Sequence, residues 1–433
     1  MNRATTHRRT LTTLAILLLT AAVMVWVGRR DGQDGPGEPG AAGQSLALAA
    51  APGQAERGAY LALAGNCAGC HTARGGAAYA GGRAIATPFG TAFTANLTPD
   101  MATGLGQWST ADFWRALHEG RSKGGRRLLP ACPYPSYTQV TRADADGLFA
   151  HLRSLPPVAL ANRPHALRFP YDTQAARLAW QLMFFRPGEF QPLAGQTDEW
   201  NRGAYLVRGL GHCAACHAGR NAFGATTAPL ALAGGMMPLQ HWYAPSLAAV
   251  SEAGVADRSA ADVVALLKTG SSARGSVLGP MAEVVYRSTQ HLTEGDLRAM
   301  AVYLKDLPPV AVPVAAPVGR AEVADPAVLL QGRQLYERHC ASCHGEQGEG
   351  AAGAYPPLAG NRALTMASPV NLVRVVVAGG YPPGTTGNPR PYGMPPFGHS
   401  LADGEIAALL SYLRSAWGHA AAPVSALDVL KLR

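Results

Sequence analysis

Six of the seven cysteines occur as three pairs, and each pair is followed directly by a histidine. The three segments are CAGCH (Cys67, Cys70, His71), CAACH (Cys213, Cys216, His217) and CASCH (Cys340, Cys343, His344). Two thiols on one helical turn can add to both vinyl groups of one haem, and the adjacent histidine then supplies the fifth iron ligand. A zinc site would need further ligands at each pair, and a redox dithiol needs no such histidine. The spacing therefore predicts three covalently bound haem c groups.

A six-coordinate haem iron also needs a sixth ligand from a well-held loop later in the chain. Met281 follows His217 by 64 residues and Met394 follows His344 by 50, and both adjoin a proline that stiffens the expected loop. A single methionine is more often a core residue than a ligand, and Met300 falls on the apolar face of an expected helix. The recurring position after the motif favours Met281 and Met394 as iron ligands.

The seventh cysteine occupies the corresponding place after the first motif. Cys132 follows His71 by 61 residues and Gly120 by 12, close to the spacing of Met281 in the second repeat. We expect a haem with histidine and cysteine ligands, in which the thiolate donates charge and lowers the reduction potential. The alternatives are a free thiol with no sixth ligand, or another ligand in its place. The candidates for that other ligand are Met101, His118 and His151.

The elements that must position these ligands recur with the motifs. A short helical segment precedes each motif. A middle helix opens at a serine that caps it and ends at a glycine before each ligand loop. A last helix follows with apolar residues at helical spacing, and Thr141 and Thr293 are expected to cap it in the first two repeats. The leading segments span 57–61, 202–206 and 332–336; the middle helices run from Ser109 to Gly120, Ser259 to Gly270 and Ser368 to Gly379. The expected fold class is mainly α, with three tandem cytochrome c-like helical domains, each wrapped on its haem.

Residues 11–27 form an uncharged apolar stretch flanked by arginines, just long enough to cross a bilayer. We predict an uncleaved N-terminal membrane anchor, with a removed signal peptide as the alternative. The expected segments are the anchor 1–30, a flexible tether 31–55, domain 1 at 56–160, an insert 161–198, domain 2 at 199–309, a Pro/Ala/Val-rich linker 310–327 and domain 3 at 328–433. Within the insert, residues 171–190 form an apolar helix that packs between domains or, alternatively, docks a partner or a membrane.

The composition excludes several function classes. The chain has 433 residues, 15% of them charged, and a formal net charge of +9. Five of the positive charges are arginines in the first thirty residues, and haem propionates would offset most of the rest. No nucleic-acid partner is therefore expected. No Gly-rich dinucleotide or phosphate loop and no GxSxG motif occurs.

The chain resembles the membrane-bound triheme cytochrome c subunits of periplasmic alcohol, aldehyde and gluconate dehydrogenases. Besides the three motifs, the resemblance rests on segments 96–100, 104–108, 133–137, 200–206, 288–290 and 388–397. It implies a catalytic partner that is a quinoprotein, molybdoprotein or flavoprotein, with or without a small extra subunit. It also implies electron delivery to ubiquinone, and a place on the inner membrane facing the periplasm. The family's first axial methionine falls on Cys132, so the properties of the first haem are not inherited.

Three covalently held, mostly six-coordinate haems leave little room for a substrate at iron. We therefore expect an electron-transfer subunit that performs no substrate chemistry on its own. The alternatives are a haem redox enzyme whose Cys132-ligated haem is catalytic, and a cytochrome subunit of a terminal oxidase.

Overall fold

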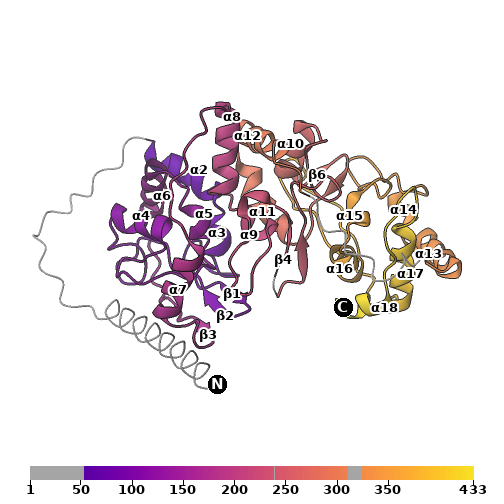
Figure 1. Cartoon of the computed structure of the whole chain (residues 1–433), viewed down its shortest axis with the longest axis horizontal. Helices are drawn as coiled ribbons and strands as arrows, with labels where there is room; N and C mark the ends of the chain where they lie inside the picture. Colours follow the sequence, from indigo (N-terminus) through magenta and orange to yellow (C-terminus); the bar gives the residue numbers. More distant parts are fainter. Residues whose placement is uncertain (1–52, 238, 311–323) are drawn as a thin grey trace, which may run out of the picture. The chain divides into compact units, whose positions relative to one another are not determined.

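The computed structural model describes residues 53–237, 239–310 and 324–433 (Figure 1). The predicted anchor, nearly all of the tether and most of the linker lie outside the described residues. Within the described ranges, no helix is both long and apolar enough to span a bilayer. The described chain is mainly helical, which confirms the predicted fold class at that level.

The chain divides into two compact units. The described part of the first unit comprises residues 53–59 and 71–190, and the second comprises residues 60–70 and 191–433. The boundary passes through helix α2 (Gln54–Ala64), whose first half belongs to one unit and second half to the other. It also separates the cysteines of the first motif from His71. The sequence predicted neither division.

The described part of the first unit contains four helices besides the start of α2. They are α4 (Thr110–Glu119), α5 (Tyr134–Tyr137), α6 (Arg142–Ser154) and α7 (Gln174–Phe184). A small antiparallel sheet of β1 (Ala84–Thr87), β2 (Gly90–Phe93) and β3 (Ala166–Leu167) has the order β1-β2-β3. Ala84 pairs with Phe93, and Thr91 pairs with Ala166. This sheet joins the chain after the first motif to the segment that precedes α7.

The second unit begins with the second half of α2 and with α3 (Cys67–Cys70), and it continues at α8. Its next helices are α8 (Asp198–Arg208), α9 (Ala214–His217), α10 (Ala260–Thr269), α11 (Pro280–Arg287) and α12 (Glu294–Lys305). Short 3-10 turns lie at Pro229–Ala231 and Thr289–His291. Two hairpin-like pairs are β4 (Gly235–Met237) with β5 (Trp242–Ala244), and β6 (Ser271–Ser272) with β7 (Gly275–Ser276).

The C-terminal part of the second unit is also helical. Its helices are α13 (Pro326–His339), α14 (Ala341–His344), α15 (Arg362–Thr365), α16 (Val370–Ala378), α17 (Asp403–Leu413) and α18 (Ala426–Leu430). They enclose a hydrophobic cluster in which Val373, Ile406 and Leu410 are fully buried. The cluster also contains Cys340, so the third motif is built into this core.

The predicted helix caps form at most of the expected positions. The Ser109 hydroxyl accepts a hydrogen bond from the amide of Asp112, whose carboxylate accepts from the Ser109 amide in return. Equivalent side-chain caps start α6, α10 and α12. The prediction that Ser368 caps a helix is wrong. Helix α16 starts after Pro369 without a side-chain cap, and Asn371 bonds the main chain of Tyr243 instead.

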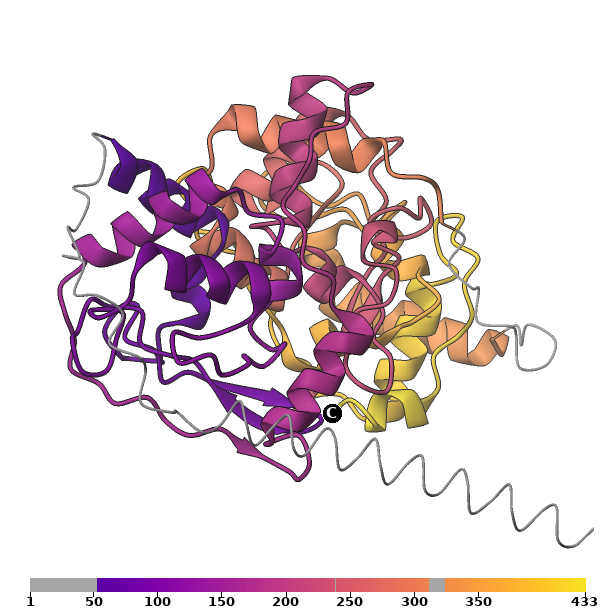
Figure 2. The ribbon, with the colours of Figure 1, turned by 60° about the vertical axis from the view of Figure 1, so that its left-hand side comes forward.

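In three places an early helix crosses a later one at a glycine. In the second unit α8 and α12 lie side by side in both views (Figures 1 and 2), and Gly203 faces the carbonyl of Ala299. Gly332 of α13 meets the carbonyl of Ala408 on α17 in the same way. In the first unit Gly58 meets the carbonyl of Gly147 on α6. A Cβ atom at any of the three glycines would clash with backbone, so close packing of these helix pairs requires glycine.

Candidate haem iron sites

The three motif histidines share one hydrogen-bonding arrangement. In each, Nδ1 lies close to a backbone carbonyl oxygen from a loop further along the chain. The pairs are His71 with Ala95 at 2.7 Å, His217 with Pro245 at 2.7 Å and His344 with Pro356 at 3.0 Å. A carbonyl oxygen can only accept, so Nδ1 must carry the proton. Nε2 is then left with a lone pair, as an iron ligand requires.

The charge state of these imidazoles also suits a metal ligand. Burial lowers the pKa of His71, His217 and His344, and this desolvation outweighs the opposing effect of the carbonyl hydrogen bonds. The neutral imidazole is therefore favoured at neutral pH. A neutral ring with a fixed tautomer is the form that binds haem iron.

Buried polar side chains hold two of the carbonyl-bearing loops. Asn96, which follows Ala95, is buried and donates from Nδ2 to the carbonyl of Val158 at 2.7 Å. Glu252 is 3% exposed and accepts from the amide of Ser246, which follows Pro245, at 2.6 Å. The segment that begins with Asn96 is one of those on which the family resemblance rests. Glu252 was not predicted from the sequence, because a lone glutamate in an apolar stretch gives no local signal.

The first cysteines of the second and third motifs have the properties of unreactive thiols. All seven cysteines of the chain are free, so none forms a disulfide. Burial raises the pKa of Cys213 and of Cys340 to about 12 in each case, which keeps these thiols protonated in the absence of a bound group. A redox dithiol needs a lowered pKa, so this environment disfavours that alternative. Within the ranges that the structure describes, no group of three or more acidic, histidine or cysteine side chains is arranged to bind a metal ion.

Met281 lies at the start of a helix, where the sequence predicted a loop. Pro280 is the first residue of α11, and Met281 is in its first turn. The preceding Gly279 has φ 58°, a left-handed conformation that turns the chain into the helix. Proline is well tolerated at this position because its missing amide would have no partner there. The methionine is thus fixed by a helix terminus as well as by proline.

The segments before Cys132 and Met281 fold back in the same way. After the middle helix, the amide of Leu128 donates to the carbonyl of Gly120 at 2.7 Å, and that of Val277 to Gly270 at 2.8 Å. Cys132 lies four residues after the donor Leu128, and Met281 lies four residues after the donor Val277. Cys132 therefore occupies in the first unit the backbone position that Met281 occupies in the second. A tight turn follows, in which the amide of Tyr134 donates to the carbonyl of Cys132 at 2.7 Å.

The alternative ligands for the first site differ in their suitability. Met101 is 62% exposed, so nothing holds its side chain in place. His151 packs edge-on against Tyr79, with ring centroids 6.0 Å apart. His118 stacks on Trp114 within α4, and its Nδ1 is buried without a hydrogen-bond partner among the described residues. His118 is thus the strongest rival to Cys132.

The third site brings its attachment cysteine and its candidate axial ligand to one core. Met394 packs against the hydrophobic cluster that contains Cys340. Its backbone forms a two-way bridge with Gly380, just after the middle helix α16, at 3.0 and 2.8 Å. The neighbouring loops also meet, because the rings of Tyr355 and Tyr392 lie 5.0 Å apart. The prediction that placed Met394 in a held loop agrees with this geometry.

Inside the second unit, the attachment segment of the first motif lies beside the second site. Cys70 is near enough to Cys216 for its charge to raise the pKa of that thiol, although burial is the larger cause. The Ser288 hydroxyl at the end of α11 donates to the carbonyl of Ala64 at 3.3 Å, and α3 packs against α11. Two cysteine pairs that the sequence separates by 146 residues are therefore spatial neighbours.

The second and third ligand segments also adjoin. The Leu278 side chain faces Gly380, which is the residue bridged to Met394. The hydroxyl of Thr385 donates to the carbonyl of Thr269, at the end of α10, at 3.3 Å. The segments that hold Met281 and Met394 are therefore packed against one another.

Buried polar atoms without partners provide a test of whether a cofactor fits these sites. Such atoms are costly unless a bound group satisfies them. Among the described residues they are Asn66 Oδ1, His118 Nδ1, Tyr134 Oη, Gln174 Nε2, Arg177 Nε and Arg374 Nε. Several of them are donors, which suits a cofactor with two carboxylates. Together with the three oriented imidazoles, they show that these residues fit haem.

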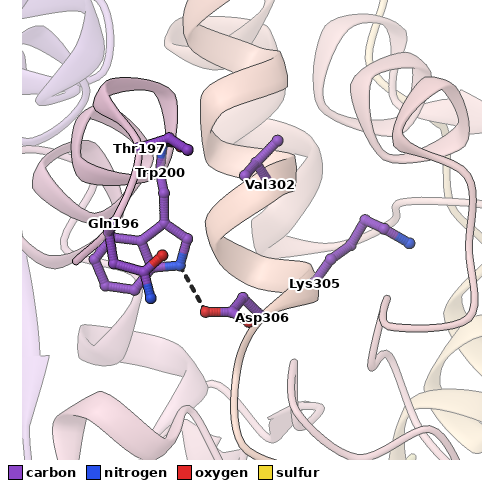
Figure 3. A pocket seen from close by; sticks show the side chains of 6 residues that line it. All are labelled: Gln196, Thr197, Trp200, Val302, Lys305 and Asp306. Atoms are coloured by element: carbon purple, nitrogen blue, oxygen red, sulfur yellow. Dashed lines mark hydrogen bonds between the residues drawn. The ribbon is translucent and has the colours of Figure 1, made fainter.

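One surface hollow contains none of the candidate ligands. It has a volume of about 350 Å³, is open to solvent, and lies at the crossing of α8 and α12 (Figure 3). Trp200 Nε1 donates to Asp306 at 2.8 Å along its edge. Its lining residues are Gln196, Thr197, Trp200, Val302, Lys305 and Asp306. The hollow is a feature of helix packing and lacks the groups of a redox site.

Comparison with known proteins agrees with this geometry. The cytochrome c family model matches residues 55–156 and 329–417. The chain is 37% identical over 397 residues to the cytochrome c subunit of a quinone-type alcohol dehydrogenase from Gluconacetobacter polyoxogenes, covering 87% of this chain and 84% of that protein. The chain belongs to the family of dehydrogenase cytochrome c subunits.

Other members of the family act with different enzymes. The gluconate 2-dehydrogenase cytochrome c subunit of Pantoea cypripedii is 35% identical, over 87% of this chain and 89% of that protein. The fructose dehydrogenase cytochrome subunit of Gluconobacter japonicus is 34% identical, over 87% and 82%. As a cytochrome c subunit, the chain binds haem c and transfers electrons. This confirms the predicted class of function.

Proposed function

We propose that this cytochrome c subunit binds three haem c groups, one at each CxxCH motif. The attachment residues are Cys67 and Cys70, Cys213 and Cys216, and Cys340 and Cys343. The axial pairs are His71 with Cys132, His217 with Met281, and His344 with Met394. When bound, each haem supplies one-electron redox chemistry, and the residues of the chain hold and orient it.

The observation that carries this proposal is the repeated orientation of the motif histidines. Three independent loops each place a carbonyl oxygen against Nδ1 of a motif histidine. Histidines with purely structural roles would not be expected to share this Nδ1 contact, which leaves the Nε2 lone pair for a metal, in all three motifs. The repeat supports three equivalent iron sites, and hence three tandem cytochrome domains at 56–160, 199–309 and 328–433. The three glycine crossings support the same division.

The contacts within the second unit support a relay through the chain. Each haem would be attached through its two cysteines, so neighbouring cysteine pairs would bring two haems near one another. Cys70 and Cys216 are neighbours of this kind. The segments that hold Met281 and Met394 pack against one another, so the second and third sites adjoin through their candidate methionine ligands. We place the second haem between the other two.

The electrons come from a dehydrogenase catalytic subunit in this proposal. Named relatives serve alcohol, gluconate and fructose dehydrogenases, so one type of cytochrome works with enzymes of different substrates. The partner, a quinoprotein, molybdoprotein or flavoprotein, would then determine the substrate. Residues 1–30 anchor the chain in the inner membrane, the body faces the periplasm, and ubiquinone accepts the electrons.

A haem count tests the three-site proposal. The full chain, produced with a c-type haem maturation system, should contain three haems per polypeptide by the pyridine haemochrome assay. Replacing both cysteines of any one motif by alanine should remove one haem and leave two. Cys132→Ala is the matched control and should retain three, because Cys132 forms no thioether. A wild-type count of two, or a motif variant with an unchanged count, would contradict the proposal.

Purification from the native membrane tests the electron-transfer role. The chain should co-purify with a dehydrogenase, and its haems should become reduced when that enzyme's substrate is added. The isolated chain should not turn over a substrate such as hydrogen peroxide or thiosulfate. Turnover by the isolated chain would instead favour the alternative of a haem redox enzyme.

A further inference from the structure

Helix α7 turns polar side chains toward the interior of the first unit. The helix is largely apolar, yet the residues that it buries are Arg177 and Gln181. Leu182 and Met183 are 65% and 54% exposed. Gln174, Arg177 and Gln181 recur at helical spacing, so they form one polar face that points into the first unit. A helix arranged in this way needs a polar partner on its buried side.

The polar face of α7 contacts the segment between the middle helix α4 and Cys132. Gln174 Oε1 accepts from the amide of Arg127 at 2.7 Å, and Arg177 Nη1 donates to the carbonyl of Arg127 at 3.1 Å. Gln181 Oε1 accepts from the Arg127 guanidinium at 2.6 Å. The ring of Phe185, at the end of the helix, packs edge-on against Tyr134 at 4.9 Å. Helix α7 is thus held against both sides of the Cys132 turn.

These contacts leave three donors unsatisfied. Arg177 Nε and Gln174 Nε2 are buried and have no hydrogen-bond partner among the described residues, and the buried Tyr134 hydroxyl, which lies beside the Gln181 amide, finds no acceptor for its proton there. The amide of Gln174 cannot be turned to remove the problem, because its oxygen is already engaged by Arg127. Three buried donors in one group of contacts require acceptors, and carboxylate oxygens are the strongest acceptors available.

The same group carries a buried positive charge. Arg177 is 8% exposed and makes no ion pair with a described residue; its guanidinium donates to the carbonyls of Arg127 and Asp172. Burial lowers the pKa of Arg177 and the nearby Arg126 lowers it further, which together outweigh the opposite effects of Asp172 and Tyr134. A buried guanidinium without a direct carboxylate contact is expensive, so the site favours an anion.

We propose that α7 forms a propionate-binding site for the first haem, with Arg177 as the ion-pair donor and Gln174 and Tyr134 as neutral donors. This rests on the proposed attachment of a haem at Cys67 and Cys70. A haem carries two propionates, which bring the missing negative charge and up to four acceptor oxygens. Cys132 adjoins the site in sequence, and both Cys132 and Arg177 act on the Tyr134 hydroxyl electrostatically. The insert is therefore a positioning element of the first haem site.

Replacing Arg177 by glutamine in the full-length holoprotein tests the proposal. A positive charge beside a haem stabilises its reduced state, so Arg177→Gln should lower the reduction potential of the first haem. We expect about a tenfold change in its one-electron equilibrium constant, which corresponds to about 59 mV. Potentiometric titration resolves the haems, and the wave missing from the Cys67→Ala/Cys70→Ala variant identifies the first. The resonance Raman propionate band should shift as well.

Two further variants complete the test. Arg177→Lys keeps the charge and should restore most of the potential, and any haem content lost in Arg177→Gln. Arg186→Gln is the matched control, because Arg186 is exposed at the end of α7 and bonds only local carbonyls. An unchanged potential and Raman band in Arg177→Gln, or loss of haem that lysine does not rescue, would overturn the proposal. A wild-type count of two haems would instead refute the underlying function.

The anion could also be the Cys132 thiolate or an ion from solution, and the same variants separate these sources. If Arg177 balances the thiolate, its effect on the potential should vanish in the Cys132→Met background, which would refute a propionate site. If it binds a solution anion, the potential of the wild type should depend on added phosphate and the Raman band should not respond. A propionate site predicts that the effect persists in both cases.

Discussion

The proposed first and second haem sites share one backbone frame, formed by the crossing of the leading and last helices, and differ in the candidate sixth ligand that this frame holds. In both, the leading and last helices cross at a glycine, and an arginine of the leading helix pairs with an aspartate of the last. Arg57 Nε donates to Asp144 at 2.8 Å, and Arg202 Nε donates to Asp296 at 2.8 Å. In both, a backbone bond to the closing glycine of the middle helix fixes the candidate ligand four residues later.

The differences are concentrated at the distal side. The first site has Cys132 where the second has Met281, and a four-residue helix α5 where the second has the eight-residue α11. Only the first receives an extra helix, α7, whose buried donors lack partners. The comparison teaches that the frame can stay constant while the ligand and its surroundings change. Reduction potential can therefore be tuned at one site without altering how the domain folds.

The largest expected effect comes from exchanging the two ligands. Cys132→Met should raise the potential of the first haem by on the order of 100 mV, because a thioether donates less charge to iron than a thiolate. Met281→Cys should lower the potential of the second haem. Spectroelectrochemistry measures both changes, and EPR of the ferric haems reports the ligand type.

His118→Gln is the control for this exchange. It should leave both potentials nearly unchanged, although it removes the strongest rival ligand. If Cys132→Met has no effect and His118→Gln alters the EPR spectrum, His118 is the ligand of the first haem, and the equivalence of Cys132 and Met281 fails.

The next largest effect tests whether the helix crossings at Gly58 and Gly203 are equivalent in the two sites. Gly58→Ala and Gly203→Ala should each lower the free energy of unfolding of their own part by about 2–4 kcal/mol, because the added Cβ clashes with a backbone carbonyl. Guanidinium unfolding followed by circular dichroism measures the change. Gly404→Ala should have almost no effect, since nothing lies within 4 Å of a Cβ there. Unequal losses at Gly58 and Gly203 would show that the two helix crossings are not equivalent.

A smaller effect is expected from the shared ion pairs. Asp144→Asn and Asp296→Asn should each cost about 1–2 kcal/mol of unfolding free energy, because the carboxylates are well buried and accept charged hydrogen bonds. Arg333→Gln, in α13, breaks a pair with Glu337 in which both side chains are more than half exposed, and should leave the free energy of unfolding almost unchanged. Thermal unfolding at low and high salt separates the buried pairs from the exposed one. A loss at Arg333 as large as at the aspartates would contradict this ranking.

The smallest effect concerns His151, which stands on α6 where the last helices of the other two repeats carry Tyr303 and Tyr412. Burial lowers the pKa of His151 from its ordinary value of 6.5. The unfolded chain then binds the proton more readily, so this contribution to stability is present above pH 6.5 and is lost as pH falls through the folded pKa. His151→Tyr should flatten the dependence of the denaturant midpoint between pH 7.5 and pH 5. An identical slope in the variant would refute this role.

Local chemistry made much of this molecule predictable. The caps at Ser109, Thr141, Ser259 and Thr293 follow from side chains within three residues of the amides that they bind. The mainly helical fold follows from the same periodic patterns. The cap predicted at Ser368 does not form. Helix α16 starts after Pro369 without a side-chain cap, and the Asn371 side chain is hydrogen-bonded to the backbone of a distant residue, Tyr243. That contact joins residues 128 positions apart.

Sequence by itself determined which residues could hold haem, because attachment depends on a spacing of three residues and axial ligation on a repeated order of elements. The tertiary structure decided what surrounds them. It placed carbonyls of Ala95, Pro245 and Pro356 against the histidines, and it turned the polar face of α7 inward toward Cys132. Such contacts depend on how separate segments pack, and a helix shows its buried face only when its neighbours are known.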